Sequence, residues 1–469
     1  MQEFKFGTGG WRAVIGEDFT QKNVRRVAEG ISLLLHEKDK IDKPVVIGYD
    51  HRFLSEDAAK WVAEVFAYYN IDTMFIDCPV PTPLVMHAVK RYNLNYGVEI
   101  TASHNPYRYN GIKLFVEEGR AASLDLTSHL EDLILTTDGN NYIPFKDALG
   151  LNAIKIVDKP FEPFIQDIIK VIDIKAIRKR HPYVLFDPMH GVGLSPLQAI
   201  FDEAGCDFNI INGSRDAYFG GLTPAPAKET LGALTNLVVK HGYDFGIAMD
   251  GDGDRLGIID ANGNYINANE ILCLLYYYLV KYKGWKGPVV RNLATTHMLD
   301  KIAESFGEKC YEVPIGFKFI SSKIDEVDAV LGGESSGGLT VRGHIHGKDS
   351  IYAASLFTEM FSVTNKSPSE LLTELQKEYG SYATAEDNLK FEAGLKNSIE
   401  NKLMVEKRLP VFKDEIIKVN YEDGCKVYFE DGWVICRFSG TEPLLRIFAE
   451  STSEERALEY IKVFKDFIF

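Results

Sequence analysis

The chain has 469 residues, 45% of them hydrophobic and 25% charged, and its 52 basic and 67 acidic side chains give a net charge of −15. A chain of this length exceeds one hydrophobic core and is typical of roughly three soluble globular domains. The acidic balance argues against a nucleic acid or an anionic membrane as partner, because both are bound through an excess of basic side chains, but a few placed arginines suffice for a small anionic substrate.

Three stretches share one outline, in which a short apolar strand is followed by a polar turn and an amphipathic helix. They are strand 44–50 with helix 56–69, strand 183–188 with helix 195–204, and strand 288–291 with helix 296–306. Continuous apolar runs before helices of roughly ten residues or more predict β-α units, with strands buried on both faces of mainly parallel sheets.

A second strand in each repeat runs directly into a polar or glycine-rich loop. These strand–loop segments are 96–106, 245–255 and 329–338, and the C-terminal region adds 433–443, which continues into another apolar strand. Open α/β sheets bind ligands with loops at the carboxyl ends of their strands, so each repeat is expected to contribute one loop to a site.

The chain ends in a region with a different pattern. It begins after the break at 365–369 and a helix through Tyr379, and it closes with a capped helix over 453–469. We therefore predict an α/β protein with three similar α/β domains, of mixed and mainly parallel sheets, and a smaller C-terminal α+β domain. The predicted divisions are residues 1–153, 154–260, 261–370 and 371–469.

The six cysteines are scattered and include no C-x-x-C pair, which argues against a disulfide framework or a zinc site and favours a reducing compartment. The first residues lack the apolar stretch of a signal peptide. The longest apolar run, 271–280, is too short to span a bilayer and predicts a buried helix. We expect a cytoplasmic protein without a membrane segment.

Three carboxylates on alternate residues, Asp250, Asp252 and Asp254, are separated by glycines and followed by Arg255. They point the same way only in an extended or looped backbone, and the glycines allow that backbone to curl round a cation. A solvated Asp-Gly turn is the plain alternative. An EF-hand is excluded, because its sixth position needs glycine and its twelfth glutamate, where this chain has Arg255 and Ala261. An all-oxygen site of this kind favours Mg²⁺ over zinc.

The segment 101–106, T-A-S-H-N-P, offers one exposed serine in a tight loop. In the plain alternative Ser103 only caps a helix. His104 beside it and Lys113 in the next strand are suited to manage protons and charge on a transferring group. A serine that accepts a phosphoryl group becomes a dianionic metal ligand, which would complete a cage with the three carboxylates. The two segments together predict a phosphoryl-transfer centre.

The segment 437–443, R-F-S-G-T-E-P, precedes a strand that carries Arg446. Two guanidinium groups, two hydroxyls and a glycine that frees backbone N–H groups predict an anion cradle, and a charged turn is the alternative. The segment 333–337, G-E-S-S-G, matches a hydrolase nucleophile elbow. That interpretation fails, because the only later histidines are His344 and His346 and no Asp or Glu lies between them and Ser335. The glutamate of this segment is better suited to sugar hydroxyls.

Lys318 lies in a glycine-containing apolar turn and is either a surface lysine or a substrate contact. Arg12 lies in a glycine-rich loop that is no Rossmann fingerprint, because no strand precedes it and G-x-G-x-x-G is absent. The segment 343–349 has neither the spacing nor the Ser or Thr of a Walker P-loop. A nucleotide is therefore not implied.

With these loops in this order the chain resembles the α-D-phosphohexomutase family, which includes phosphoglucomutases and phosphomannomutases. The resemblance runs nearly end to end and rests on T-A-S-H-N-P, D-G-D-G-D-R, G-E-S-S-G and R-x-S-G-T-E-P. It implies four domains around a central cleft, Mg²⁺ as cofactor, hexose phosphates as substrates and hexose 1,6-bisphosphate as priming intermediate. The oligomeric state is left open between monomer and homodimer.

The resemblance also implies a role for each matching residue. Ser103 would be the phosphoserine, and its phosphate would hold Mg²⁺ together with Asp250, Asp252 and Asp254. Transfer or proton movement would be assisted by Arg255, His104, Lys113 and Lys318. Arg12 would support the serine loop, and the sugar hydroxyls would be bound by Glu334 and Ser336. The non-reacting phosphate would be held by Arg437, Ser439, Gly440, Thr441 and Arg446.

The chain departs from the family pattern in three segments. Phe438 replaces the proline of R-P-S-G-T without removing a donor. Ser350 stands where K-D-G has glycine, which weakens the support for Lys348 as a substrate contact. Gly10 and Trp11 form a variant of the opening motif.

These features predict a mutase that interconverts hexose 1-phosphate and hexose 6-phosphate through a phosphoserine and a hexose 1,6-bisphosphate. T-A-S-H-N-P rather than S-A-S-H-N-P, and Gly-Gly at 337–338 rather than Gly-His, favour glucose or mannose phosphates. The alternatives are a phosphoglucosamine mutase and a non-catalytic sugar-phosphate-binding relative. The intact serine and aspartates argue against the non-catalytic alternative.

Overall fold

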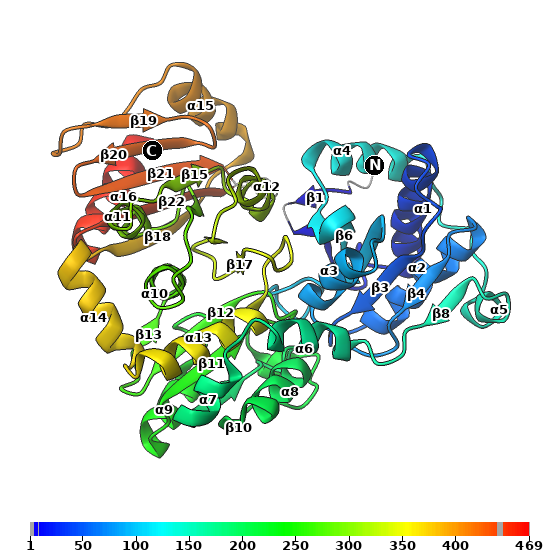
Figure 1. The fold of residues 1–469 in the computed structure, drawn as a ribbon. Helices are drawn as coiled ribbons and strands as arrows, with labels where there is room; N and C mark the ends of the chain where they lie inside the picture. The colour runs from blue at the N-terminus through cyan, green and yellow to red at the C-terminus, as the bar shows by residue number, and fades with distance from the viewer. Residues whose placement is uncertain (1–3, 8, 439–443, 469) are drawn as a thin grey trace. The chain divides into compact units, whose positions relative to one another are not determined.

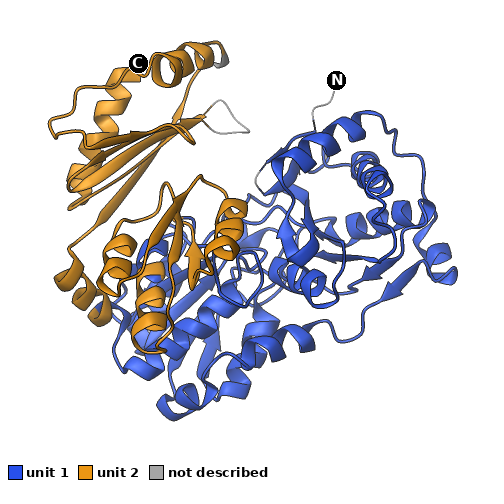
Figure 2. Cartoon of the chain, turned by 45° about the horizontal axis from the view of Figure 1, so that its top comes forward, with its two compact units in different colours: residues 1–271, 336–369 blue, residues 272–335, 370–469 orange. Residues whose placement is uncertain are grey.

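The computed structural model describes residues 4–7, 9–438 and 444–468. The chain forms two compact units (Figure 2). Unit 1 consists of residues 1–271 and 336–369, and unit 2 consists of residues 272–335 and 370–469.

The first sheet of unit 1 carries the serine loop (Figure 1). Its strand order is β1-β2-β6-β5-β3-β4-β8, with β7 beside β6. The strands are β1 (Phe6–Gly7), β2 (Gly10–Val14), β3 (Val45–Tyr49), β4 (Thr73–Phe75), β5 (Tyr96–Ile100), β6 (Tyr109–Val116), β7 (Arg120–Ala121) and β8 (Ile154–Ile156). The pairs among β5, β3, β4 and β8 are parallel, and β6 returns antiparallel to β5. The central strands β3 and β5 are buried throughout, as their continuous apolar sequences predict.

Five helices accompany this sheet: α1 (Gln21–Glu37), α2 (Ser55–Tyr68), α3 (Thr82–Arg91), α4 (Leu124–Leu135) and α5 (Phe145–Gly150). Thr20 caps α1 by accepting a hydrogen bond from the amide of Asn23 at 3.3 Å. The helix buries Val24, Val27 and Ile31, which recur at helical spacing, in the core of this sheet.

The second sheet of unit 1 has the order β10-β9-β11-β12-β13. Its strands are β9 (Tyr183–Asp187), β10 (Asp207–Ile210), β11 (Phe245–Met249), β12 (Leu256–Asp260) and β13 (Tyr265–Ile266). The first three are parallel, and β12 returns antiparallel to β11 after the aspartate loop. Its helices are α6 (Phe161–Ile169), α7 (Ile174–Arg180), α8 (Leu194–Ala204) and α9 (Gly232–His241).

A late segment of the chain completes unit 1. It contains β17 (Leu339–Val341) and α13 (Ser350–Thr364), and α13 packs against α7 and α8 of the second sheet. Phe357 and Phe361 of α13 place their rings edge-on to Phe245 of β11, with centroids 5.6 and 5.1 Å away. The strand that leads to the aspartates is therefore covered by a helix about 100 residues further along the chain.

Unit 2 holds a parallel sheet and an antiparallel sheet. The parallel order is β15-β14-β16, from β14 (Val289–Asn292), β15 (Cys310–Val313) and β16 (Leu331–Gly333), with helices α11 (Met298–Ser305) and α12 (Phe317–Val327). The antiparallel order is β18-β22-β21-β20-β19, from β18 (Ala383–Lys390), β19 (Lys418–Asn420), β20 (Cys425–Phe429), β21 (Gly432–Phe438) and β22 (Leu444–Ser451). Helix α16 (Glu454–Ile468) packs on this sheet, and α15 (Lys396–Glu400) precedes β19.

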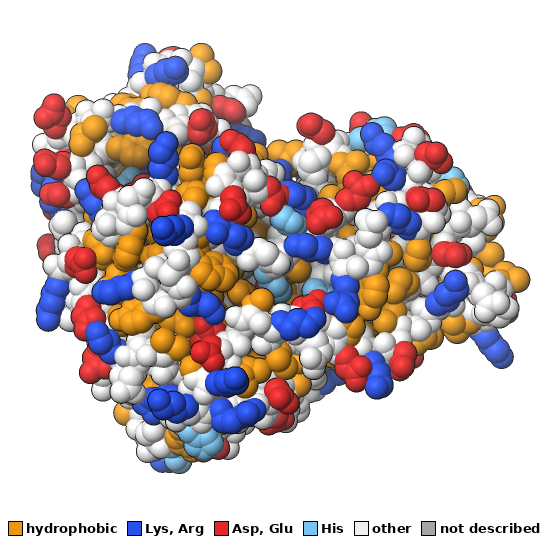
Figure 3. All heavy atoms as spheres, in the orientation of Figure 1, with side chains coloured by type: hydrophobic (Ala, Val, Ile, Leu, Met, Phe, Trp, Pro, Cys, Tyr) orange, Lys and Arg blue, Asp and Glu red, His pale blue; other side chains and the backbone are white. Residues whose placement is uncertain are grey.

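Two helices connect the units along the chain, α10 (Ala268–Lys281) and α14 (Pro368–Tyr379). The apolar run 271–280 forms most of α10 and is buried, as predicted. Among the described residues, no helix is both long and apolar enough to cross a membrane. On the face drawn in Figure 3, acidic and basic side chains are interspersed rather than gathered by sign.

The predicted fold class is confirmed. Each predicted β-α pair is present within a few residues of its expected position. The two sheets of unit 1 are mixed, the strands β15, β14 and β16 of unit 2 are parallel, and the C-terminal sheet is antiparallel. The division of the chain at residues 153, 260 and 370 remains a prediction.

Candidate active site

Ser103 lies in the loop between β5 and β6, at the carboxyl end of a central strand. Its backbone is in the left-handed region, with φ of 52°, and its amide donates to Thr101 Oγ1 at 2.8 Å. A positive φ is unusual for a residue with a side chain and persists only where the surroundings enforce it. The serine was expected to be exposed, and this expectation is wrong: Ser103 has 1% relative exposure, because the aspartate loop covers it.

Asp250 follows β11 and joins the two predicted segments. Its Oδ1 accepts the amides of Asp254 at 2.9 Å and Arg255 at 3.0 Å, which fixes the curl of the loop. Its Oδ2 accepts the Ser103 hydroxyl at 2.9 Å. The structure therefore brings the serine and the first aspartate into direct contact across 147 residues of sequence.

Gly251 is the point of closest backbone approach between the two loops. A Cβ atom at this position would lie 2.8 Å from the carbonyl oxygen of Ser103, closer than such atoms pack. Only glycine allows this contact without movement of the backbone. Gly253 in the same loop has φ of 69°, which lets the chain turn between Asp252 and Asp254.

The three aspartates form a cluster suited to a cation. Asp250, Asp252 and Asp254 each offer an oxygen within 4.8 Å of the others, and all three residues are buried. Asp252 Oδ1 and Asp254 Oδ1 have no hydrogen-bond partner. Buried carboxylate oxygens without donors are costly in the absence of a cation, and an all-oxygen donor set matches Mg²⁺. The residues present therefore fit a magnesium ion.

Lys113 of β6 neutralises part of this cluster. Its Nζ donates to Asp252 Oδ2 at 2.5 Å and to Asp254 Oδ2 at 3.2 Å. Burial alone would lower the pKa of Lys113, but the two carboxylates outweigh it and raise the pKa above its ordinary value. Thr82 donates a further hydrogen bond to Asp252 Oδ2 at 2.7 Å. Lys113 is therefore an ammonium ion beside the cluster.

Lys348 and Ser350 bring a second segment to the aspartate loop. Lys348 Nζ lies 3.0 Å from Asp254 Oδ2, and the Ser350 hydroxyl donates to the carbonyl of Gly253 at 2.6 Å. The serine that departs from the family pattern therefore makes a hydrogen bond that glycine could not make. Ser336, predicted to contact sugar, is exposed in the same unit.

Positive charge surrounds His104, whose Nδ1 lies 3.4 Å from Ser103 Oγ. Burial first, and then Arg255 and Arg12, lower the pKa of this imidazole far below its ordinary value, so the ring is neutral. Arg12 Nη1 donates to Asn105 Oδ1 at 2.6 Å, which attaches it to the loop that carries Ser103. Burial and Arg255 lower the pKa of Arg12 to about 10.

In unit 2, Glu334 contacts the turn that precedes the helix carrying Lys318. Glu334 follows β16, and its Oε1 accepts hydrogen bonds from the amide of Gly316 at 3.1 Å and from Asn292 Nδ2 at 3.3 Å. Gly316 precedes α12, whose second residue is Lys318. The glutamate therefore holds the turn that presents the lysine.

Arg437 and Arg446 are direct cross-strand partners on β21 and β22. Like charges opposite each other destabilise a sheet, so this pair indicates an anion site. Asp423 balances part of the charge: its Oδ1 lies 3.2 Å from Arg437 Nη2, and its Oδ2 accepts the amide of Ile315 at 2.9 Å. Ser439, Gly440 and Thr441, predicted for the same cradle, lie outside the described residues.

Three further residues that contact the site, Asp50, Arg52 and Thr82, were not predicted from the sequence. Asp50 and Arg52 follow an apolar strand, β3, in the same way as Ser103 follows β5. That position was the available signal, since the carboxyl ends of parallel strands share one edge of the sheet.

Family models of phosphoglucomutase/phosphomannomutase match the chain in four parts: α/β/α domain I over residues 3–141, domain II over 162–263, domain III over 267–379 and the C-terminal domain over 396–466. A phosphoglucomutase/phosphomannomutase of Thermococcus kodakarensis is 31% identical over 458 residues, covering 98% of this chain and 97% of the relative. A phosphoglucosamine/phosphogalactosamine mutase of Sulfurisphaera tokodaii is 27% identical over 464 residues, covering 99% and 98%. The crystal structure of a candidate phosphomannomutase from Thermus thermophilus has a TM-score of 0.86 and 27% identity, covering 100% of this chain and 99% of that one.

Proposed function

This chain belongs to the α-D-phosphohexomutase family of phosphoglucomutases and phosphomannomutases, and we propose that it interconverts hexose 1-phosphates and hexose 6-phosphates through a phosphoserine at residue 103. The observation that carries this proposal is the 2.9 Å hydrogen bond from Ser103 Oγ to Asp250 Oδ2. It puts the serine hydroxyl of the T-A-S-H-N-P loop against a buried carboxylate cluster that fits a magnesium ion.

The reaction consists of two reciprocal transfers at Ser103. A free hydroxyl of the hexose phosphate attacks the phosphorus carried by Ser103, and the bond from phosphorus to Oγ breaks. The sugar hydroxyl loses its proton, and the departing Ser103 Oγ gains one, so the serine leaves as a neutral hydroxyl. The hexose 1,6-bisphosphate formed turns over, and its other phosphate returns to Ser103. One set of groups therefore serves both orientations of the sugar.

The side chains of unit 1 stabilise charge and hold the serine. Lys113 and Arg255 place positive charge beside the transferring group, where it is most effective in a site that excludes water. His104 presents a neutral ring nitrogen close to Ser103 Oγ, and Lys348 neutralises Asp254. A magnesium ion held by Asp250, Asp252, Asp254 and a phosphoserine oxygen would supply further positive charge.

The remaining predicted residues bind the rest of the substrate. Glu334 and Ser336 are assigned to the sugar hydroxyls. Lys318 lies two residues after Gly316, whose amide donates a hydrogen bond to Glu334. The opposed guanidinium groups of Arg437 and Arg446 are assigned to the phosphate that does not react, together with Ser439, Gly440 and Thr441.

Glucose or mannose phosphate is the proposed substrate. The choice is supported by Gly-Gly at 337–338, where Gly-His would favour glucosamine phosphate. A Cβ atom on Gly338 would lie 2.0 Å from Lys348 Cδ, so the stem of the lysine occupies the space that a larger residue here would need. Lys348 thereby reaches Asp254. Glucosamine phosphate is the second candidate, because a phosphoglucosamine/phosphogalactosamine mutase aligns with almost the whole chain. Parallel assays with the 1-phosphates of glucose, mannose and glucosamine distinguish the two by kcat/KM.

The proposal is tested with Ser103→Ala and with the control Ser195→Ala, which changes an exposed serine. The wild type and the control are expected to carry a phosphoryl adduct by intact mass and to lose it on incubation with substrate. Ser103→Ala is expected to lack the adduct and to lose turnover on all three sugar phosphates. Mutase activity in Ser103→Ala close to that of the control would refute the assignment.

A further inference from the structure

Arg52 is a buried arginine whose guanidinium group faces the backbone of the loop that carries Ser103. Its side chain has 0% relative exposure. Its Nη2 donates to the carbonyls of Ser103 at 2.5 Å and Asn105 at 2.6 Å, and its Nη1 donates to those of Pro106 and Tyr109, each at 3.0 Å. One side chain therefore satisfies three carbonyls of the loop between β5 and β6, including that of the serine, and the carbonyl of the first residue of β6.

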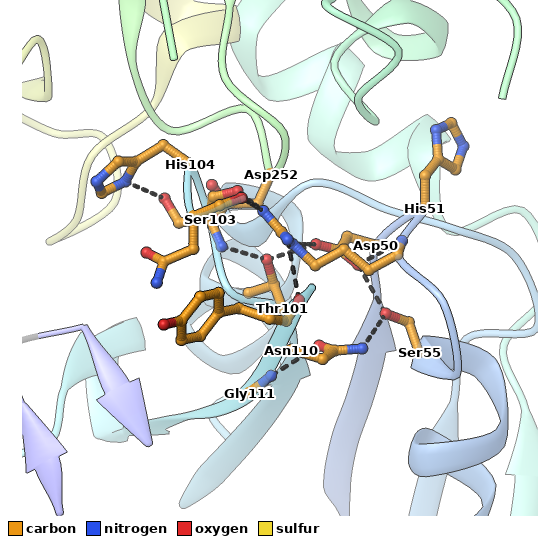
Figure 4. A network of polar contacts seen from close by, with 12 residues as sticks. Asp50, His51, Ser55, Thr101, Ser103, His104, Asn110, Gly111 and Asp252 are labelled. Carbon is orange, nitrogen blue, oxygen red and sulfur yellow. Dashed lines mark hydrogen bonds and ion pairs between the residues drawn. The ribbon is translucent and has the colours of Figure 1, made fainter. Parts of the chain in front are cut away.

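Asp50 is the counterion of Arg52 and extends the network to the amide of the serine. Asp50 Oδ2 lies 3.3 Å from Arg52 Nε and accepts the Thr101 hydroxyl at 2.6 Å. Thr101 Oγ1 in turn accepts the Ser103 amide at 2.8 Å. Figure 4 shows Asp50, Thr101 and Ser103 in this connected network at the edge of the sheet. The carbonyl and the amide of Ser103 are thus both fixed by one buried ion pair.

The chemistry of arginine is what this arrangement needs. A guanidinium group is planar, remains charged and offers five donors in a rigid fork, whereas a lysine ammonium offers three donors at one point. The spread donors of a guanidinium group can form hydrogen bonds with four carbonyls in different directions, but the three donors of a single ammonium nitrogen cannot. The Arg52 guanidinium carbon also lies 4.8 Å from the Phe219 ring centroid, which fixes the plane of the group from the other side.

We propose that Arg52 is a positioning residue for phosphoryl transfer, which holds Ser103 in its left-handed backbone conformation and thereby keeps Oγ against Asp250. This inference rests on the proposed function of Ser103. Arg52 acts through the backbone of the loop and contacts neither the sugar nor its phosphates. Its loss therefore changes the rate of transfer to and from Ser103 and leaves the binding of hexose phosphate intact.

The test compares Arg52→Lys with Arg26→Lys. Arg26 is a matched control, because its guanidinium group also donates to backbone carbonyls in the same sheet region, those of Thr137 at 3.0 Å and Ile134 at 3.3 Å, away from the serine loop. Arg52→Lys is expected to lower kcat about 100-fold with KM changed less than about twofold, since a small misplacement of a reacting group has effects of this order. Arg26→Lys is expected to keep kcat within about twofold of the wild type.

A second measurement separates positioning from a general loss of structure. Hydrogen–deuterium exchange is expected to increase in peptides covering residues 101–109 of Arg52→Lys and to stay unchanged in peptides covering 250–255. An unchanged kcat, a rise in KM alone, or equal loss of protection in both peptides would overturn the inference.

The phosphorylation rate distinguishes this inference from the proposed function. Wild-type enzyme stripped of phosphate is incubated with glucose 1,6-bisphosphate, and the adduct is followed by intact mass. If the wild type gains the adduct on Ser103 and Arg52→Lys gains it as fast, only the role of Arg52 is wrong. If the wild type gains no adduct and Ser103→Ala remains active, the proposed function itself fails.

Discussion

Lys113 and a bound cation would share the carboxylate groups of Asp252 and Asp254, each through a different oxygen. The lysine ammonium lies within 3.2 Å of oxygens of both Asp252 and Asp254, while the other oxygen of each has no hydrogen-bond partner. The lysine offsets part of the repulsion among the three buried carboxylates, and a cation would offset the rest.

Lys113→Met is therefore expected to make the protein depend on the cation for stability. In EDTA the variant should lose about 3 kcal/mol of unfolding free energy, because a buried charge pair has lost one partner. Added Mg²⁺ should raise its melting temperature more than that of the wild type, and mutase activity should be lost. Thermal unfolding with and without Mg²⁺ measures this, with Lys159→Met, an exposed lysine paired with Glu162, as control. An equal response to Mg²⁺ in all three proteins would contradict the expectation.

The residues of the site differ in how far the sequence could reveal them. Ser103 and the aspartates were found because their chemistry is unusual for a loop. The burial of Ser103 was missed, because no local sequence pattern shows that the loop around Gly251 covers it. Arg52 was missed because its partners are backbone carbonyls, which leave no trace in the identity of the neighbouring residues. Ser350 was taken as a departure, and its hydrogen bond to Gly253 depends on a contact between distant segments.

At the scale of elements, the β-α units were predictable and their partners were not. Apolar runs such as 45–49 and 245–249 identify central strands, because a strand covered on both faces must be apolar throughout. Helix α1 was not predicted, although its buried residues recur at helical spacing. Nothing in the local sequence of α13 indicates that it packs on α7 and α8, since packing partners are set by the whole fold.

Helices α3 and α6 are joined by one polar cluster in unit 1. Asp167 of α6 accepts hydrogen bonds from His87 Nε2 at 2.9 Å and Arg91 Nη1 at 2.6 Å, both on α3, and from Lys170 at 2.7 Å. Burial would raise the pKa of Asp167, but the hydrogen bonds from Lys170, His87 and Arg91 outweigh it and lower the pKa to about 2.

Asp167→Asn is expected to lower the free energy of unfolding by about 1 kcal/mol at neutral pH, as for a partly exposed ion-pair network. The pKa of the folded state is below the unfolded value of 3.8, so the contribution is complete above that value and is lost as pH falls towards about 2. Urea unfolding at decreasing pH should show the difference between wild type and variant shrinking over this range. A difference that is constant with pH, or one as large in the exposed control Asp132→Asn, would contradict the role of Asp167.

At the scale of the molecule, the contact between the serine loop and the aspartate loop was predicted from the chemistry of their side chains. No sequence pattern links the two loops. A phosphorylated serine and a carboxylate cage have a shared purpose only if they touch, and the structure joins Ser103 to Asp250 by a direct hydrogen bond. The family match extends this reasoning to four domains. The buried charges that connect the two sheets of unit 2 were not predicted, because no shared chemical function links their residues in the sequence.

These charges centre on Glu312 of β15 and Lys426 of β20, whose Oε2 and Nζ atoms are 2.6 Å apart. Arg291 of β14 lies 2.5 Å from the same carboxylate, and Lys426 Nζ is 4.3 Å from the Trp433 ring centroid. Burial and the charge of Arg291 lower the pKa of Lys426 to about 7, even though Glu312 opposes them. Lys426 therefore remains in its buried position largely because Glu312 is present.

Glu312→Gln is expected to destabilise the protein by about 3 kcal/mol, because it leaves the buried Lys426 without the carboxylate that compensates it. Adding Lys426→Met should restore part of this loss, since Arg291 keeps Asp300 at 2.7 Å and no unpaired cation is left. Urea unfolding followed by circular dichroism gives the coupling energy of the two changes. The control Glu326→Gln removes an exposed partner of Lys323 and should cost less than about 1 kcal/mol. If the double variant lost the sum of the two single losses, the pair would act independently, and the sheets of unit 2 would be joined by their apolar contacts alone.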